Sequence, residues 1–203
     1  FNTKNKFDPC AGSAGMQALY GIIQGGIYED LREESAKFNA ENDNFFGLAI
    51  GGSLGQNKDQ MYEVVKKTTN KLNNSRPLHL LGIGDPLDIW NLVEYGIDTF
   101  DCVTPTRLAR HGSALTRSNF GKINIKNSKY ASILGPIDEN CKCISCSNYS
   151  LSYLHHLFKS NELTAFQLIS LHNIYFMNDL MAYIRNAIKN DNFYEAKKDW
   201  YIN

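Results

Sequence analysis

The chain has 203 residues, 43% of them hydrophobic, and its 21 Lys and Arg residues balance its 21 Asp and Glu residues. This size and composition predict a globular protein with a sizeable core, and the sequence has neither a signal-peptide pattern nor an apolar run of about eighteen residues. We therefore expect a soluble, cytoplasmic protein with no membrane span. The balanced charge neither indicates nor excludes a polyanionic partner.

The first half of the sequence repeats one pattern, in which an apolar run ends in a glycine or polar residue and a stretch with helical spacing follows. After a polar opening loop at residues 1–15, the predicted strands with their turns are 18–26, 46–52, 78–84 and 97–103. The predicted helices are 28–40, 58–72 and 86–95. Alternation of this kind predicts an α/β fold with parallel strands, whose functional groups lie at the carboxyl ends of the strands. One such glycine is most often only a tight turn, but four successive strand ends carry glycine or polar groups.

The character of the sequence changes at residue 104. The segment 104–129 is basic and rich in turn residues, and residues 101–130 hold six basic side chains and one acidic one, a local net charge of +5. Short strands are expected at 113–117 and 122–126, and helices at 149–159 and 163–189. A basic run alone is most often a solvated surface, but this one follows a strand-end aspartate and could face phosphates.

Three of the five cysteines lie within six residues. They are Cys141, Cys143 and Cys146. Such crowding indicates a metal site rather than disulfides, and a tetrahedral zinc ion needs a fourth ligand. We select His172, because a side chain in the long predicted helix can reach back to the cysteine loop, whereas His155 and His156 suit helix packing or RNA contact. A lone helical histidine is usually not a ligand, but three thiolates need a partner. A closed Cys3His shell predicts one structural Zn²⁺.

Five motifs now occur in a recognisable order. They are QGG at 24–26, AIGG at 49–52, LGIG at 81–84, FDCV at 100–103 with PTR at 105–107 and Arg110, and the Cys3His set. Over nearly all of residues 16–190 the sequence resembles the tRNA-guanine transglycosylase (queuine tRNA-ribosyltransferase) family.

The resemblance implies a fold, the C-terminal half of a (β/α)8 TIM barrel with an inserted zinc-binding subdomain. The barrel units, roughly strands five to eight, would be residues 1–103, the basic segment and zinc-binding loop residues 104–148, and the C-terminal helices that complete the zinc site residues 149–203. A complete barrel needs eight strands. We therefore expect the first half, with a second aspartate for acid-base chemistry, to lie upstream or on another chain, and this fragment to be inactive alone.

The resemblance also implies an enzyme, a pentosyltransferase that exchanges guanine at the wobble position of a tRNA with a GUN anticodon for a 7-deazaguanine base, queuine or its precursor. Asp101 matches the nucleophile, which forms a covalent aspartyl-ribose intermediate. The residues that match base-binding groups are Gln24, Gly51, Gly52, Leu81 and Gly82. The residues that match tRNA-binding groups are Thr106, Arg107 and Arg110. The four predicted zinc ligands match the family's, and we expect a homodimer with the zinc-binding subdomain as a contact surface.

The loop at 51–56 departs from the bacterial pattern of the family, since it is one residue shorter and has Ser53 and Gln56 where Leu and Glu are usual. A Glu would favour a cationic aminomethyl substituent, so Gln56 predicts a preference for the bulkier queuine-type base. Two alternatives stay open. One is a non-catalytic tRNA-binding subunit of a two-chain transglycosylase. Such a subunit would lack the nucleophile, and the presence of Asp101 argues against it. The other is a zinc-dependent nucleic-acid-binding module, in which the strand motifs would have no purpose.

Overall fold

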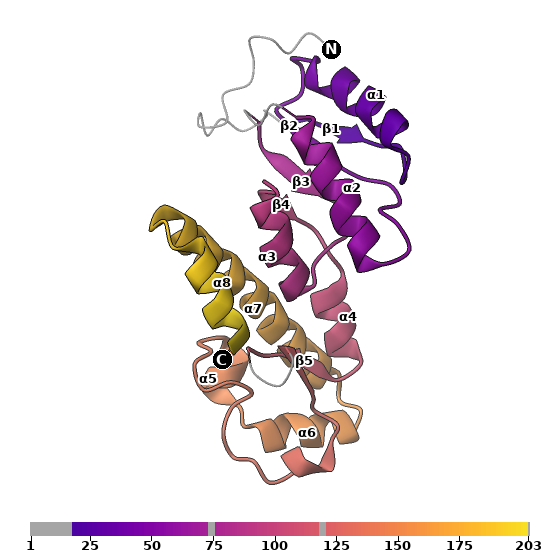
Figure 1. Cartoon of the computed structure of the whole chain (residues 1–203). Coiled ribbons are helices and arrows are strands. Elements are labelled where there is room, and N and C mark those ends of the chain that lie inside the picture. Colours follow the sequence, from indigo (N-terminus) through magenta and orange to yellow (C-terminus); the bar gives the residue numbers. More distant parts are fainter. Residues whose placement is uncertain (1–17, 73–75, 118–120, 203) are drawn as a thin grey trace. The chain divides into compact units, whose positions relative to one another are not determined.

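Figure 1 shows the computed structural model of the chain. The structure describes residues 18–72, 76–117 and 121–202, so the opening loop predicted at residues 1–15 lies outside the described residues. The chain divides into two compact units, Phe1–Cys102 and Val103–Asn203. We call them unit 1 and unit 2 and describe each by itself.

Unit 1 is a parallel β-sheet with helices in its connections. Its strands are β1 (Tyr20–Ile23), β2 (Gly47–Ile50), β3 (Leu78–Leu80) and β4 (Thr99–Phe100). Its helices are α1 (Glu29–Ala40), α2 (Lys58–Asn70) and α3 (Pro86–Glu94). The strands pair in parallel in the order β1-β2-β3-β4, which confirms the predicted α/β class. The strands are shorter than the apolar runs because each run continues into the turn that follows it.

The strand register separates the side chains of the sheet into two faces. On one face Ile23, Ile50 and Leu80 are in register, are fully buried, and form a core with apolar residues of all three helices. Right-handed crossovers between sequential parallel strands place the connecting helices on a single face. The alternate residues, such as Ile22 and His79, therefore point to the face away from the helices.

Side-chain caps determine where two of the helices in unit 1 begin. Asn57 accepts a hydrogen bond from the Gln60 amide at the start of α2, and Asp85 accepts one from the Leu87 amide at the start of α3. Each cap satisfies a backbone donor that has no partner within its helix. Because α2 and α3 begin directly after the loops that follow β2 and β3, these caps also fix the lengths of the loops at the carboxyl edge of the sheet.

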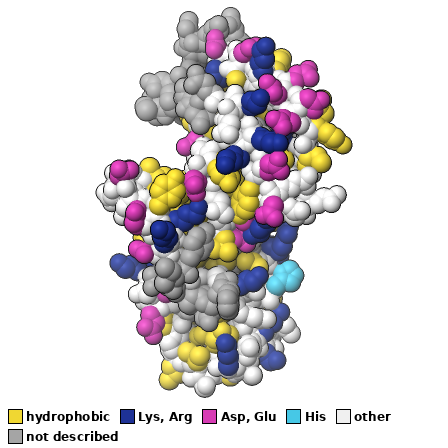
Figure 2. Space-filling view, viewed as in Figure 1, with side chains coloured by type: hydrophobic (Ala, Val, Ile, Leu, Met, Phe, Trp, Pro, Cys, Tyr) yellow, Lys and Arg dark blue, Asp and Glu magenta, His cyan; other side chains and the backbone are white. Residues whose placement is uncertain are grey.

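Ion pairs join the exposed faces of α1 and α2. Lys67 Nζ lies 3.0 Å from Glu29 Oε2, and Lys71 Nζ lies 2.9 Å from Glu33 Oε2. Figure 2 shows basic and acidic side chains interspersed over these helices. Water and salt screen such exposed pairs, so they contribute little to stability. This surface has no field of one sign that would attract a polyanion.

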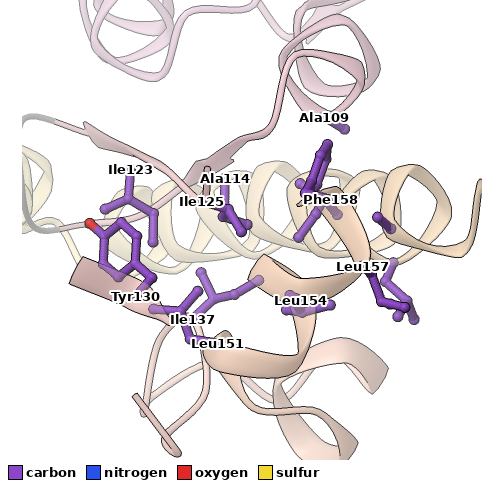
Figure 3. Packing of buried hydrophobic residues seen from close by; sticks show 13 residues of the cluster. Ala109, Ala114, Ile123, Ile125, Tyr130, Ile137, Leu151, Leu154, Leu157 and Phe158 are labelled. Atoms are coloured by element: carbon purple, nitrogen blue, oxygen red, sulfur yellow. The ribbon is translucent and has the colours of Figure 1, made fainter. Parts of the chain in front are cut away.

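Unit 2 is a helical unit with a small β-hairpin, in which most other elements pack on one long helix, α7 (Leu163–Lys189). The others are α4 (Thr104–Arg110), β5 (Ser113–Leu115), β6 (Lys122–Asn124), the 3-10 helix η2 (Ser128–Tyr130), α5 (Ile144–Asn148), α6 (Leu151–Lys159) and α8 (Phe193–Ile202). Figure 3 shows the core of unit 2, where Leu154 and Phe158 of α6 gather with Ile125 and with Ala109 of α4. No helix of the described residues has the length and apolar character that a bilayer crossing needs.

The structure confirms the two helices and both short strands that the sequence predicts in this unit, and among the described residues it adds three α-helices and the 3-10 helix η2. The segment 104–110, expected to be turn-rich, forms α4, which begins with Pro105 in its first turn. Proline is favourable there because the first turn has no intrahelical use for its amide. Helix α5 is a short helix that begins directly after Cys143 and contains Cys146, and α8 lies in the tail.

Arg117 belongs to the basic segment but is engaged within unit 2. Its Nη2 donates to Asp179 Oδ2 at 2.8 Å, and its guanidinium carbon lies 4.2 Å from the centre of the Trp200 ring. Trp200 also packs edge-on against Phe176 of α7. Arg117 therefore joins the hairpin segment to α7 and α8 through a cation-π contact and an ion pair.

Candidate functional site

The residues predicted to bind the base lie in one layer at the carboxyl ends of the four strands. The register pairs Ile23 with Ile50, Ile50 with Leu80 and Leu80 with Phe100. The next residues along the four strands are Gln24, Gly51, Leu81 and Asp101. Because strand side chains alternate, these four positions belong to the face away from the helices. The structure thus brings together predicted site residues from four separate segments of the sequence.

Two glycines allow this layer to pack closely. A Cβ at Gly51 would lie 2.9 Å from Leu81 Cδ1 and 3.1 Å from Gln24 Nε2. A Cβ at Gly52 would lie 2.5 Å from Gln24 Oε1, and the φ of Gly52 is +78°, a conformation that costs other residues about 1–2 kcal/mol. The Gln24 amide therefore lies directly against the backbone of the predicted base-binding loop.

The Asp101 carboxylate is oriented by two hydrogen bonds to the same oxygen. His79 Nε2 and the Gly82 backbone amide each lie 3.1 Å from Asp101 Oδ1. No residue of the described part of the chain bonds to Oδ2, and 60% of the side chain is exposed. The orientation of Oδ1 thus fixes the position of Oδ2, which has no hydrogen-bond partner among the described residues and is available to react.

His79 is a site residue that the sequence analysis does not select. Its Nδ1 lies 2.8 Å from Thr99 Oγ1, and it pairs with Thr99 across β3 and β4. We assign the tautomer from this network: the Thr99 hydroxyl donates to Nδ1, so that Nε2 carries the hydrogen that it donates to Asp101. One feature of the sequence could have identified it: His79 is the one polar residue in the apolar run at 78–83.

The predicted tRNA-binding residues all lie on α4, in unit 2. Thr106 Oγ1 donates at 3.2 Å to the Val103 carbonyl, which also accepts the Arg107 amide at 2.9 Å. Arg107 and Arg110 are exposed and three positions apart, so they share one face of the helix. Neither forms an ion pair with a residue that the structure describes, which leaves both guanidinium groups free for a ligand.

Four side chains of unit 2 form a cluster that can hold a metal ion. They are Cys141, Cys143, Cys146 and His172, the predicted ligands, and their donor atoms all lie within 4.8 Å of one another. His172 Nδ1 lies 3.7, 3.5 and 3.4 Å from the sulfur atoms of the three cysteines in chain order. In a tetrahedral site with Zn–S of about 2.3 Å and Zn–N of about 2.0–2.1 Å, the N···S edge is about 3.6 Å. The cluster fits an ion of this kind.

The surroundings of His172 prepare its Nδ1 for a metal. The ring is fully buried, and Nε2 lies 2.8 Å from the Leu115 carbonyl, to which it donates. This bond fixes the tautomer that leaves Nδ1 as the ligand atom. By contrast, His155, the nearest alternative, uses its Nδ1 for the Ile125 carbonyl at 2.7 Å.

Asn173, next to this ligand, links the cluster to α4. It is fully buried; its Oδ1 accepts from the Leu115 amide at 2.8 Å, and its Nδ2 donates to the carbonyls of Pro105 and Ser113 at 2.9 and 3.1 Å. Leu115 is thus bonded through its carbonyl to His172 and through its amide to Asn173. One turn of α7 therefore positions both the metal cluster and the helix that carries the arginines.

The cluster holds a proton where a metal can bind. Burial alone would lower the pKa of His172, but hydrogen bonds with the three cysteine sulfurs and the Leu115 carbonyl raise it to about 12. Burial would raise the pKa of Cys143, but hydrogen bonds from His172 and the Cys146 amide help to lower it to about 6. A Cys143 thiolate beside the protonated imidazole is the metal-free counterpart of a thiolate beside a cation, so metal binding displaces the proton on His172 Nδ1.

Comparison with known proteins decides the family. Residues 2–203 match the family described as "Queuine tRNA-ribosyltransferase". The chain belongs to this family. The predicted resemblance is thereby confirmed.

Curated relatives in this family are similar across most of the chain. A queuine tRNA-ribosyltransferase of Thermoanaerobacter sp. (strain X514) is 47% identical over 186 residues, which cover 91% of this chain and 49% of the relative. A putative queuine tRNA-ribosyltransferase of Archaeoglobus fulgidus is 46% identical over 192 residues, which cover 91% of this chain and 47% of the relative. A queuine tRNA-ribosyltransferase of Roseiflexus sp. (strain RS-1) is 47% identical over 186 residues. The chain thus spans about half the length of the relatives that it matches.

His172→Ala should weaken metal binding by at least about 100-fold, since loss of a ligand exceeds the 10- to 100-fold effect typical of an outer-shell partner. Inductively coupled plasma mass spectrometry after dialysis measures the amount of metal retained per chain. His156→Ala is the matched control, because His156 is exposed on α6, and it should retain the wild-type content. Full metal content in His172→Ala would contradict the assignment of His172 as a ligand.

Proposed function

We propose that this chain is the part of a tRNA-guanine transglycosylase that carries the nucleophile, Asp101. The observation that carries the proposal is the free Oδ2 of Asp101, next to an oxygen oriented by His79 and Gly82. The family assignment supports the reaction class. In this proposal residues 1–103 are the second half of a (β/α)8 barrel, with the face away from the helices as its interior, and residues 104–148 and 149–203 build the zinc-binding subdomain.

In the proposed reaction Asp101 Oδ2 attacks C1′ of the target nucleotide. The bond from C1′ to guanine N9 breaks, the electron pair leaves with the purine, and a covalent aspartyl-ribose forms. His79 and the Gly82 amide hold the carboxylate so that Oδ2 faces the ribose. N9 of a 7-deazaguanine base then attacks C1′ and releases the aspartate, while the N9 proton passes to the acid-base group that protonated guanine, so two displacements retain the configuration. One glycosidic bond replaces another, and neither ATP nor water is consumed.

The departing purine carries negative charge until it is protonated. The Gln24 amide and the backbone N–H of Gly52 lie side by side and would donate to its carbonyl, as in an oxyanion site. Leu81 and Gly51 complete the wall of this base site. The proton itself would come from an acid outside this chain, the second aspartate expected in the other half of the barrel.

The proposed substrate is a tRNA with a GUN anticodon, whose wobble guanine lies in a loop where a base can leave its stack. Arg107 and Arg110 would contact the nucleotides beside that guanine, with Thr106 at the start of the same helix. Their exposure and freedom from ion pairs support this role. Phosphate contacts of this kind position the RNA without reading its sequence.

We propose zinc as the metal because three thiolates and one imidazole are a donor set that zinc prefers. The ion would be held by Cys141, Cys143, Cys146 and His172. Four protein ligands fill its shell, so its contribution is structural, and it stabilises the helices that carry the ligands. We further propose that the enzyme is a homodimer and that unit 2 supplies a contact surface.

Asp101→Asn should abolish the covalent protein–tRNA adduct and slow guanine exchange at least about a thousandfold, while tRNA binding stays within about threefold of wild type. The measurement is a denaturing gel of the full-length enzyme after incubation with tRNA and guanine. Asp98→Asn is the control, since Asp98 bonds the Leu78 amide at the opposite end of the sheet. Binding without an adduct in the wild-type enzyme would instead favour a non-catalytic tRNA-binding subunit.

Gly52→Ala should raise the KM for guanine by at least about tenfold, because the added methyl displaces the Gln24 amide and strains the backbone. Gly121→Ala is the matched control: its φ of +84° imposes similar strain, but nothing lies within 4 Å of the added carbon. Steady-state exchange kinetics distinguish the two. Equal KM values for guanine in the two variants would contradict the assignment of Gly52 to the base site.

The choice of incoming base tests the role of Gln56, which is exposed at the end of the loop after β2. We expect the wild-type enzyme to prefer queuine to the aminomethyl base, and Gln56→Glu to shift the preference toward the cationic aminomethyl base by about 5- to 10-fold through charge attraction. Competition of the two bases for release of labelled guanine measures the ratio. A wild-type preference for the aminomethyl base would contradict the prediction.

A further inference from the structure

Arg32 is a buried cation behind the proposed base site. It lies in the first turns of α1, and only 4% of the residue is exposed. Its Nε donates to the Gly26 carbonyl at 2.6 Å, and its Nη2 donates to the carbonyls of Gly51 and Ser53 at 3.0 and 3.3 Å. One guanidinium therefore joins the loop after β1 to the loop after β2.

The setting of Arg32 costs stability. No carboxylate of the described residues forms an ion pair with it, and its buried Nη1 has no hydrogen-bond partner among them. Burial lowers the pKa of the guanidinium from its ordinary value. An apolar side chain would avoid both the unpaired charge and the unsatisfied donor. Arg32 offsets this cost by donating to three backbone carbonyls, which an apolar side chain would leave without that donor.

The bond to Gly51 has a chemical consequence. The Gly51 carbonyl and the Gly52 N–H belong to the same peptide group. A cation that donates to the carbonyl draws electron density through that group, so the N–H becomes a stronger donor. The Gly52 N–H is the backbone group proposed to face the purine, and Gln24 lies beside it.

The glycine at position 25 makes this arrangement possible. A Cβ at Gly25 would lie 2.7 Å from the Arg32 amide nitrogen and 2.9 Å from Arg32 Cγ, and the φ of Gly25 is +132°. The backbone N–H of Gln24 donates to Ser35 Oγ at 3.0 Å, which holds the loop against α1. The close approach of α1 to the loop thus brings the guanidinium beneath both loops.

We propose that Arg32 is a positioning residue of the base site, which joins the two loops and polarises the Gly51–Gly52 peptide so that the Gly52 N–H stabilises negative charge on the departing purine. This inference rests on the proposed transglycosylase function. Arg32 does not touch the substrate. It acts through the peptide that does.

The test compares Arg32→Gln, which removes the charge, with Arg32→Lys, which keeps the charge but loses the fork that reaches both loops. In the full-length enzyme, Arg32→Gln should raise the KM for guanine and slow adduct formation by about 10- to 100-fold, with the KM for tRNA within about twofold of wild type. Arg32→Lys should be intermediate. Arg76→Gln is the matched control, since Arg76 also donates to a backbone carbonyl, that of Asn42, away from the base site. It should change neither KM.

Several results would overturn the proposal. A guanine KM and adduct rate within about twofold of wild type in Arg32→Gln would do so, as would equal increases in both KM values. Thermal melting identifies variants that do not fold; if Arg32→Gln fails to fold, the KM values of Arg32→Lys decide, and if neither folds, Arg32 is a structural residue only. Failure of the proposed function gives a different result, since the wild-type enzyme would then exchange no guanine.

Discussion

The parallel register of β1 to β4 is the constraint on which the proposed base site depends. It places Gln24, Gly51, Leu81 and Asp101 in one layer and turns that layer away from the helices. A slip of one residue in any strand would direct its site residue into the helix-facing core. The buried residues Ile23, Ile50 and Leu80 prevent such a slip because they must remain in that core. Packing on one face of the sheet thus maintains chemistry on the other.

In unit 2 the short elements α4 and β5 have few hydrogen bonds of their own and are positioned by side chains of α7. The buried pair His172 and Asn173 bonds both backbone groups of Leu115, and Asn173 also bonds Pro105 of α4. A metal that fixes His172 therefore stiffens the turn of α7 on which α4 is anchored. In this way the proposed metal site, although closed, would still affect the position of the helix that carries Arg107 and Arg110.

The sequence predicts the elements whose signals are local. Alternating apolar runs identify the α/β units, and thiolate chemistry limits the choice of metal ligands to a few residues. Helix α4 is not predicted, because seven residues are too short for an apolar period. His79 is not predicted, because its contact with Asp101 depends on the pairing of β3 with β4. Arg32 is not predicted, because its partners are backbone carbonyls, and these carry no signature in the sequence.

The contacts of Arg117 reduce the number of basic side chains in unit 2 that are available to a polyanion. Residues 101–130 contain six basic side chains, but Arg117 is already neutralised by Asp179 and covered by Trp200. A cation that is paired in the free protein displaces few counterions when RNA binds, and each phosphate contact contributes about 0.7–0.9 to the slope of log affinity against log salt. If the segment binds RNA as proposed, its affinity will therefore fall less steeply with salt than a count of its basic residues implies.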